Sequence, residues 1–264
     1  MFAHPDDEAL LAGGVLARHA ASGARTAVVT ATWAPGTHRA AELADATAIL
    51  GAGPPLLLGY ADHRIPHSAP GRPRLCDAPP DEVIGLLVGH IRALRPEIVV
   101  THDAYGQLTG HPDHRRTHRL TALAFTASGL EHLYPDAGEP WQPKALYAAT
   151  HPHSAVADLG PLLAGVDKSV LSVPDGMVDT AVDVRPWLDR KWDAILAHRS
   201  EVAKARPLPA LLSRLPPEVR ARIIGTEYFT AVHRAREPGG RLNRLTAGGG
   251  AGAAAGAGAS DRTG

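Results

Sequence analysis

Two short segments of the chain place histidine and aspartate in the same pattern. The first reads Ala-His-Pro-Asp-Asp-Glu over residues 3–8, and the second reads Gly-His-Pro-Asp-His over residues 110–114. In each segment proline suits the first helical position, and the residue three after the first histidine lies on the same side of that turn. His4 and Asp7 can therefore bind one metal ion, and His114 can reach the same ion from the second segment.

Two imidazoles and one carboxylate form a ligand set that suits zinc and also accepts iron or another divalent metal. Such a set leaves one coordination position open for water. Zinc lowers the pKa of that water toward ~7 and so makes hydroxide available at neutral pH. The ligand pattern indicates a hydrolase with one metal ion per chain.

The residues between the ligands can carry out proton transfer. Asp6 precedes a ligand, points elsewhere on the turn and can accept a proton from the metal-bound water. His111 can stabilise a developing oxyanion or protonate a leaving nitrogen. Asp113 can hold His111 in the required tautomer, as carboxylates behind functional histidines do.

The rest of the chain predicts an α/β fold. Apolar or alternating runs predict strands over residues 26–32, 56–60, 98–101, 144–150 and 177–184. Helical spacing, together with start and stop signals, predicts helices over residues 6–22, 37–50, 81–94, 112–128 and 186–203. Proline-rich residues 65–80 predict a loop. This alternation favours a Rossmann-like, doubly wound, mostly parallel sheet with helices on both faces.

Both segments stand at turns of the kind where doubly wound sheets bind ligands. Each alone is also typical of a capped helix start, but two of them in one α/β pattern favour the metal site. His118 lies four residues after His114 and offers an alternative helical metal pair, although its arginine neighbours favour an exposed basic face. Surface positions are expected for the loop histidines His63, His67, His151 and His153, and an incidental thiol for Cys76.

Composition excludes several other classes of protein. The 264 residues include 27 basic and 27 acidic side chains, so no global charge favours a nucleic acid or an anionic membrane as partner. The single cysteine excludes a disulfide framework and a thiolate zinc cluster. No signal peptide and no apolar stretch of about 20 residues is evident, so we expect a cytoplasmic protein. We expect one domain over residues 1–244 and a disordered Gly/Ala-rich tail over residues 245–264.

The paired segments resemble the PIG-L/LmbE-like family of metal-dependent deacetylases. The similarity extends from residue 1 to about residue 234 and includes Arg-Ala-Ala-Glu-Leu at residues 39–43 and His-Arg-Ser at residues 198–200. Members act on N-acetylglucosaminyl compounds, including the inositol glycoside of the mycothiol pathway and GlcNAc-phosphatidylinositol. The resemblance therefore implies a small amino-sugar substrate that loses its N-acetyl group.

The resemblance also implies a role for each matching residue. His4, Asp7 and His114 match the zinc ligands of the family, Asp6 matches its general base, and His111 matches its second catalytic group. Arg39 matches an arginine that contacts the polar end of the substrate. A structural salt bridge between Arg39 and Glu42 or Asp45 is an equally good interpretation.

Three features depart from the family pattern. Family members have an apolar strand before the first segment, whereas only Met1 and Phe2 precede Ala3, so we expect the true reading frame to start upstream. The mycothiol-pathway enzymes carry a tyrosine where this chain has Thr109, and Tyr105 lies further back in the loop. The loop over residues 33–37 is also short. These departures bear on the substrate more than on the reaction.

Three alternatives stay open. The first is an amidase that acts on mycothiol S-conjugates, which needs a pocket open to a bulky cysteinyl group. The second is a nucleotide-binding enzyme, but a glycine-rich phosphate loop would then replace the first segment. The third is a carbohydrate-binding relative without activity, against which the complete ligand set and Asp6 argue.

Overall fold

Strands and helices alternate along the first half of the chain as the sequence predicts. The computed structural model describes residues 1–166, 168 and 170–234. The strands are β1 (Val29–Thr32), β2 (Leu56–Tyr60), β3 (Ile98–His102), β4 (Ala145–Thr150), β5 (Thr180–Asp183) and β6 (Thr226–Arg234). The α-helices are α1 (Asp7–Ala21), α2 (His38–Leu50), α3 (Pro80–Leu94), α4 (Pro112–Ala127), α5 (Leu159–Ala164), α6 (Leu188–Ala197), α7 (Arg199–Val202), α8 (Leu208–Ser213) and α9 (Pro217–Ile224). The predicted domain end at residue 244 and the predicted tail over 245–264 lie outside the described residues.

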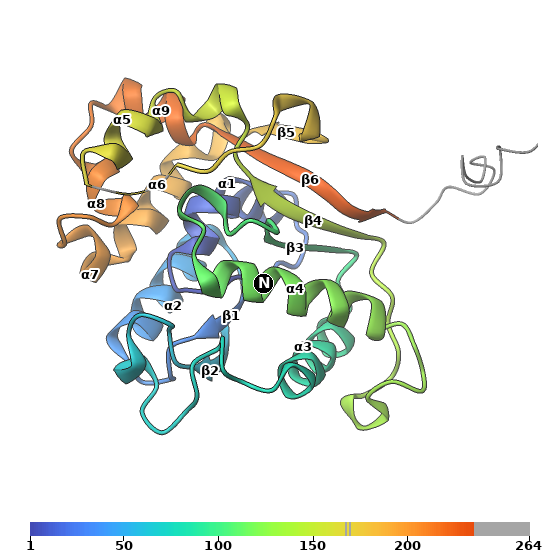
Figure 1. The fold of residues 1–264 in the computed structure, drawn as a ribbon. Coiled ribbons are helices and arrows are strands. Elements are labelled where there is room, and N and C mark those ends of the chain that lie inside the picture. Colours follow the sequence, from blue (N-terminus) through green and yellow to red (C-terminus); the bar gives the residue numbers. More distant parts are fainter. Residues whose placement is uncertain (167, 169, 235–264) are drawn as a thin grey trace, which may run out of the picture. The chain divides into compact units, whose positions relative to one another are not determined.

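The strands form two sheets that the first residues of the chain connect (Figure 1). β1 pairs with β2 in parallel, and a second sheet has the order β3-β4-β6-β5. Phe2 forms a parallel bridge with Thr30 of β1, while the Met1 ammonium donates a hydrogen bond of 2.7 Å to the Val100 carbonyl of β3. Residues 1–3 thus lie between β1 and β3 and connect the two sheets.

The prediction of a mostly parallel sheet is only partly correct. β3 and β4 are parallel, but β6 runs antiparallel to both β4 and β5, so the larger sheet is mixed. β6 was not predicted, because its inward positions include Glu227 as well as Phe229 and the buried carboxylate interrupts the apolar alternation. The fold class is therefore α/β with a parallel first part and an antiparallel strand, β6, between β4 and β5.

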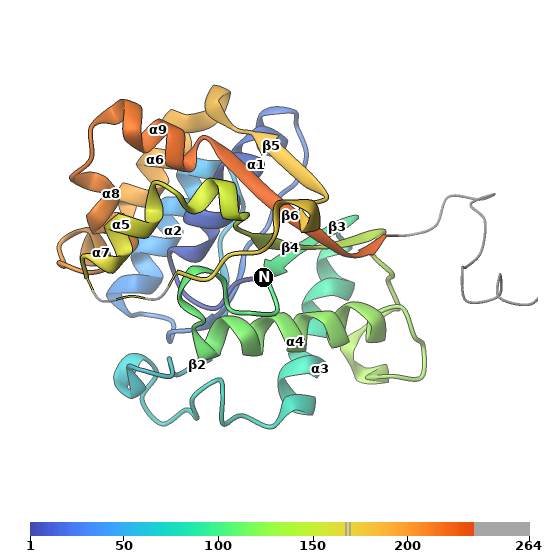
Figure 2. The same cartoon turned by 45° about the horizontal axis from the view of Figure 1, so that its top comes forward.

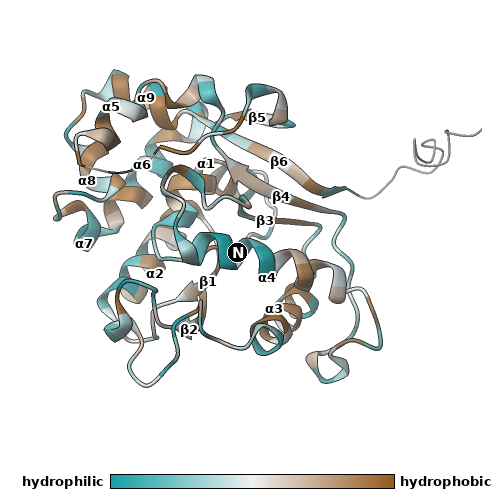
Figure 3. Cartoon of the chain, in the orientation of Figure 1, coloured by the Kyte–Doolittle hydropathy of each residue, from teal (hydrophilic) through white to brown (hydrophobic). Residues whose placement is uncertain are grey.

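Two hydrophobic clusters hold the helices in place. α3 and α4 share one cluster with β1 and β2, whereas α1, α2 and α6 share another. The second half of α4 carries its apolar side chains, while its first half is polar where it meets the second motif (Figure 3). None of the helices within the described part of the chain combines the length and apolar composition that a bilayer crossing requires.

Local signals explain the ends of several helices. The Thr37 side chain accepts a hydrogen bond from the Ala40 amide, and Gly51 ends α2 in the left-handed conformation, in agreement with the helix predicted over residues 37–50. The predicted helix over residues 186–203 is divided at His198 into α6 and α7. α5, α8 and α9 were not predicted, and they gather near α6 in both views (Figure 1, Figure 2). These short helices form one wall of the pocket described next.

Candidate metal centre and active site

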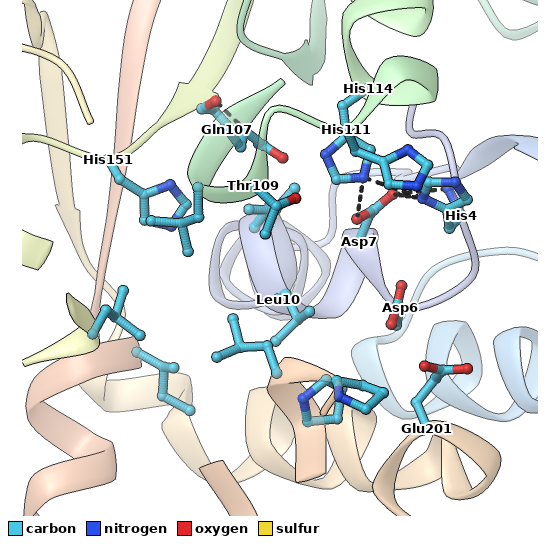
Figure 4. A pocket seen from close by; sticks show the side chains of 18 of the residues that line it. His4, Asp6, Asp7, Leu10, Gln107, Thr109, His111, His114, His151 and Glu201 are labelled. Atoms are coloured by element: carbon cyan, nitrogen blue, oxygen red, sulfur yellow. Dashed lines mark hydrogen bonds and ion pairs between the residues drawn. The ribbon is translucent and has the colours of Figure 1, made fainter. Parts of the chain in front are cut away.

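Both motif segments open onto one pocket of about 320 Å³ (Figure 4). The first segment leads from the central residues into α1, and the second leads from β3 through a short loop into α4. The residues of the predicted site that line the pocket are His4, Asp6, Asp7, Arg39, His111 and His114. Asp113 is fully buried behind the pocket wall. α5, α8 and α9 contribute aliphatic side chains at the other end of the pocket, among them Leu159, Leu208 and Ile223.

The three predicted metal ligands converge on one point. His4 Nδ1 lies 3.1 Å from His114 Nε2 and 3.4 Å from Asp7 Oδ2. His114 Nε2 lies 3.3 Å from Asp7 Oδ1. Two imidazole nitrogens that face each other at this distance can bond only if one carries a proton, whereas a cation between them and the carboxylate would satisfy all three. This buried donor set therefore fits a divalent metal ion.

The Asp113 carboxylate orients a metal-site histidine, and this differs from the prediction. His4 Nε2 lies 3.1 Å from Asp113 Oδ2, so the proton of a neutral His4 resides on Nε2 and its Nδ1 lone pair faces Asp7 and His114. The same carboxylate accepts hydrogen bonds from the His63 amide and the Cys76 thiol. Carboxylates behind metal-binding histidines commonly have this function.

His111 is oriented by the main chain instead. It is the N-cap of α4, and its Nδ1 accepts a hydrogen bond of 3.2 Å from the Asp113 amide, while the Asp113 carboxylate is 3.9 Å away. Because Asp113 lies in the first turn of α4, its amide faces back to the N-cap and its side chain turns toward His4. Burial, followed by the charges of His4 and His114, lowers the pKa of His111 strongly. A neutral His111 then carries its proton on Nε2.

Asp6 occupies a strained turn beside the ligands. Its φ of 123° lies in the left-handed region that non-glycine residues avoid, a conformation that the sequence does not predict. The Glu8 carboxylate accepts a hydrogen bond of 3.0 Å from the Asp6 amide and so helps to hold the turn. Burial, with a smaller contribution from Asp7, raises the pKa of Asp6 to about 6 against the opposing charge of Arg39. A carboxylate with this pKa is suited to general base catalysis near neutral pH.

Arg39 contacts the strained turn directly. Its guanidinium lies 3.2 Å from Asp6 Oδ2 and 3.3 Å from Glu201 Oε1, donates to the Pro5 carbonyl and stacks over the Trp33 ring. The alternative salt bridge to Glu42 or Asp45 is not formed. Glu42 instead accepts two hydrogen bonds from Ser200, and Asp45 pairs with Arg199.

His102 contacts both motif segments, although the sequence analysis did not single it out. This fully buried residue ends β3, and its Nε2 accepts a hydrogen bond of 2.8 Å from the Ala3 amide. Its ring stacks on His114 with 4.0 Å between centroids and an angle of 10°. Burial lowers the pKa of His102 to about 4, in keeping with a neutral ring. Its place at the end of the strand before the second motif was the one available signal.

Other histidines and the loop before the second motif complete the surroundings. His118 donates from Nδ1 to the His102 carbonyl at 2.7 Å. His151 lines the pocket rather than the surface. Thr109 lines the pocket at the position of the family tyrosine, whereas Tyr105 is 54% exposed and is not part of the lining. Burial, followed by the Asp113 contact, raises the pKa of the Cys76 thiol to about 12, which makes it a poor nucleophile.

Comparison with known proteins agrees with this geometry. Residues 1–125 match the PIG-L family, described as GlcNAc-PI de-N-acetylase. A relative in Rhodococcus jostii, named 1D-myo-inositol 2-acetamido-2-deoxy-alpha-D-glucopyranoside deacetylase, is 35% identical over 93% of this chain and 96% of its own length. The N,N'-diacetylchitobiose deacetylase of Pyrococcus horikoshii shares the fold, with a TM-score of 0.61 at 19% identity over 87% of this chain and 81% of its own.

The fold alone does not define the reaction. GalB, a 4-carboxy-2-hydroxymuconate hydratase of Pseudomonas putida KT2440, also shares it, with a TM-score of 0.59 at 20% identity over 90% of this chain and 96% of its own. The long sequence match to the Rhodococcus deacetylase is more specific than this likeness of fold. The chain belongs to the PIG-L family of de-N-acetylases.

Proposed function

We propose that this protein is a zinc-dependent N-deacetylase that removes the acetyl group from an N-acetylglucosaminyl substrate such as GlcNAc-inositol. The observation that carries the proposal is the convergence of His4, Asp7 and His114 beside Asp6 and His111 in one pocket. The reaction named for the Rhodococcus relative supports the choice of substrate.

His4 Nδ1, Asp7 and His114 Nε2 would hold the zinc ion. When bound, zinc supplies Lewis acidity that lowers the pKa of a water toward ~7 and polarises a carbonyl. Asp113 keeps the His4 proton on Nε2, so that Nδ1 offers its lone pair. The Asp7 side chain is held in place because its Oδ2 accepts a hydrogen bond of 2.8 Å from the His4 main-chain amide.

Asp6 accepts the proton of the attacking water. The carboxylate lines the pocket one residue before a ligand, and its raised pKa lets it both take and return a proton near neutral pH. Arg39 and the strained turn fix its direction, so the base needs little reorganisation during the reaction.

His111 acts on the substrate carbonyl, whereas Asp6 acts on the water. Because its Nδ1 is held by the Asp113 amide, its Nε2–H is free to donate to the oxygen of the amide carbonyl as negative charge develops there. The departing amine then takes a proton, which Asp6 can return. Thr109, which stands in the sequence where the mycothiol-pathway enzymes carry a tyrosine, also lines the pocket.

The test combines metal analysis with acetate release. The protein freed of metal should regain activity with one equivalent of zinc and should release acetate from GlcNAc-inositol faster than from free GlcNAc. His114→Ala should lose zinc and activity, while the matched variant His118→Ala on the same helix should keep both. Zinc binding without acetate release from any N-acetylglucosaminyl compound would favour the carbohydrate-binding alternative. Preference for S-conjugates would favour the amidase.

A further inference from the structure

We propose that His102 is a positioning residue that fixes both metal-binding segments in place. The inference rests on the proposed zinc-dependent function. His102 belongs to neither motif, yet it lies between them at the end of β3 and is fully buried. Its ring accepts a hydrogen bond from Ala3, the residue before His4, and stacks on His114.

One set of contacts is directed at the first segment. The Ala3 amide donates to His102 Nε2 at 2.8 Å, and the Phe2 ring meets His102 edge-on at 5.3 Å between centroids. Ala3 directly precedes His4, and the neighbouring residue Phe2 pairs with Thr30 of β1 through an isolated bridge. The hydrogen bond to His102 therefore fixes the main chain from which His4 projects.

A second set of contacts is directed at the second segment. His102 stacks on the face of His114, and this contact joins the end of β3 to the second segment. His114 Nδ1 is buried and has no hydrogen-bond partner among the described residues. Metal-binding histidines usually have such a partner to set the direction of the ring. For His114, the stack on His102 supplies that orientation by packing.

The same geometry argues that His102 is not itself a ligand. Its Nε2 lies 3.4 Å from Asp7 Oδ2, close enough to belong to the donor cluster. However, the Ala3 amide uses the Nε2 lone pair, and Nδ1 donates to Gln107 Oε1 at 2.8 Å. Gln107 is held in turn by its bond to the Ala149 carbonyl. Both ring nitrogens are engaged, so His102 acts on the metal only through its neighbours.

The experiment separates the two contacts. His102→Phe keeps a flat ring that can stack on His114 but removes both hydrogen bonds, whereas His102→Gln keeps an acceptor for the Ala3 amide and removes the stack. The matched control is His118→Phe, which removes a histidine of the same helix whose Nδ1 bonds to the His102 carbonyl and whose ring is not stacked on His102 in the described structure. The readouts are zinc affinity by competition with a chromophoric chelator, the visible spectrum of the cobalt-substituted protein, and the melting temperature of the metal-free protein.

We expect both His102 variants to bind zinc about 10–100-fold more weakly, in the range known for partners of metal ligands, with an altered cobalt spectrum. The control should keep its zinc affinity and spectrum. If a variant fails to fold, Gln107→Leu removes the Nδ1 acceptor without changing His102 and should weaken zinc binding several-fold.

Two results would overturn the proposal. Unchanged zinc affinity with a lowered melting temperature would make His102 a core residue only. Loss of one imidazole from the cobalt coordination shell in His102→Phe would make it a ligand. A wild-type protein that binds no zinc would remove the proposed function itself, whereas wild-type zinc binding with unaffected variants removes only the role of His102.

Discussion

The first and second halves of the domain contribute differently to the pocket. Residues 1–127 consist of regular strand–helix units and contain the proposed ligands, the base Asp6 and His111. Residues 145–234 contain the antiparallel strands and the short helices, and they line the far end of the pocket. The family match also covers residues 1–125. We infer that the first half determines the reaction and the second half determines which substrates fit.

Buried glutamates are among the groups that join the two halves. His198 donates to Glu8 at 2.7 Å, Glu201 pairs with Arg39, and Glu227 accepts hydrogen bonds from the Gly14 and Val15 amides of α1. Changes in the first half should therefore affect metal binding and rate. Changes to the groups that join the halves should affect stability and pH dependence while leaving the metal in place.

The largest effect is expected for a ligand. Asp7→Ala should lose zinc and nearly all activity, and excess zinc should restore part of it, because the two histidines still bind weakly. Zinc content measured beside kcat checks this. Asp45→Ala is the control, since Asp45 pairs with Arg199 at the surface and should change neither quantity. An Asp7 variant with full zinc content would remove Asp7 from the ligand set.

The next effect separates binding of the metal from proton transfer. Asp6→Asn should keep zinc while kcat falls by roughly 10²–10⁴, the usual contribution of a positioned general base. The amide preserves the size of the side chain, so the strained turn should persist. If Asp6→Asn loses zinc while Asp7→Ala keeps it, the two carboxylates have been assigned in the wrong order.

The first half could be predicted from sequence because its signals are local. Thr37 and Gly51 mark the ends of α2, and the two motifs mark the starts of α1 and α4. β6 escaped prediction because Glu227, an inward residue, is stabilised by the Gly14 amide of α1, 213 residues away, and by Lys191, 36 residues away. A pattern within β6 cannot reveal partners that lie in other elements.

The same distinction applies to the site. The convergence of His4, Asp7 and His114 followed from spacing within two turns. The link between Asp113 and His4 did not, because it depends on how α4 is rotated relative to the first segment. His102 and Glu201 also contact the site through tertiary packing, and neither residue belongs to one of the two sequence motifs.

A change in the second half of the domain should lower the stability of the protein without loss of the metal. Lys191 bonds to Glu227 at 2.7 Å, and both side chains are almost completely buried. Lys191→Met should lower the free energy of unfolding by about 3–5 kcal/mol, because it leaves a buried carboxylate without its counterion. The control Lys144→Met breaks an exposed pair with Glu97 and should cost less than about 1 kcal/mol. Urea unfolding with zinc analysis checks both, and loss of zinc from Lys191→Met would contradict the division into halves.

A smaller effect should appear in the pH dependence of the rate. Arg39 lowers the pKa of Asp6, so Arg39→Ala should raise that pKa above its value of about 6. Because the base must be deprotonated, the acidic limb of the kcat profile should move to higher pH, with a greater loss at pH 6 than at pH 8. The substrate-contact hypothesis instead predicts a higher KM with an unchanged limb. A pH–rate profile with KM at each pH distinguishes the two.

The smallest effect concerns the pH dependence of stability through His198. Burial is the largest single influence and lowers the pKa of His198, but the charge and hydrogen bond of Glu8, together with the charge of Asp6, outweigh it, and the net pKa is raised above 6.5. A raised folded-state pKa means that the folded protein binds the proton more tightly than the unfolded chain. The contribution of His198 is therefore fully present below pH 6.5 and is lost as pH rises through the folded-state pKa.

The difference in unfolding free energy between wild type and His198→Gln should accordingly shrink from pH 6 to pH 9. Urea unfolding of the zinc-loaded proteins at several pH values measures it. A difference that grows with pH would mean that the folded protein holds His198 neutral, and that the second half contacts Glu8 without an ion pair.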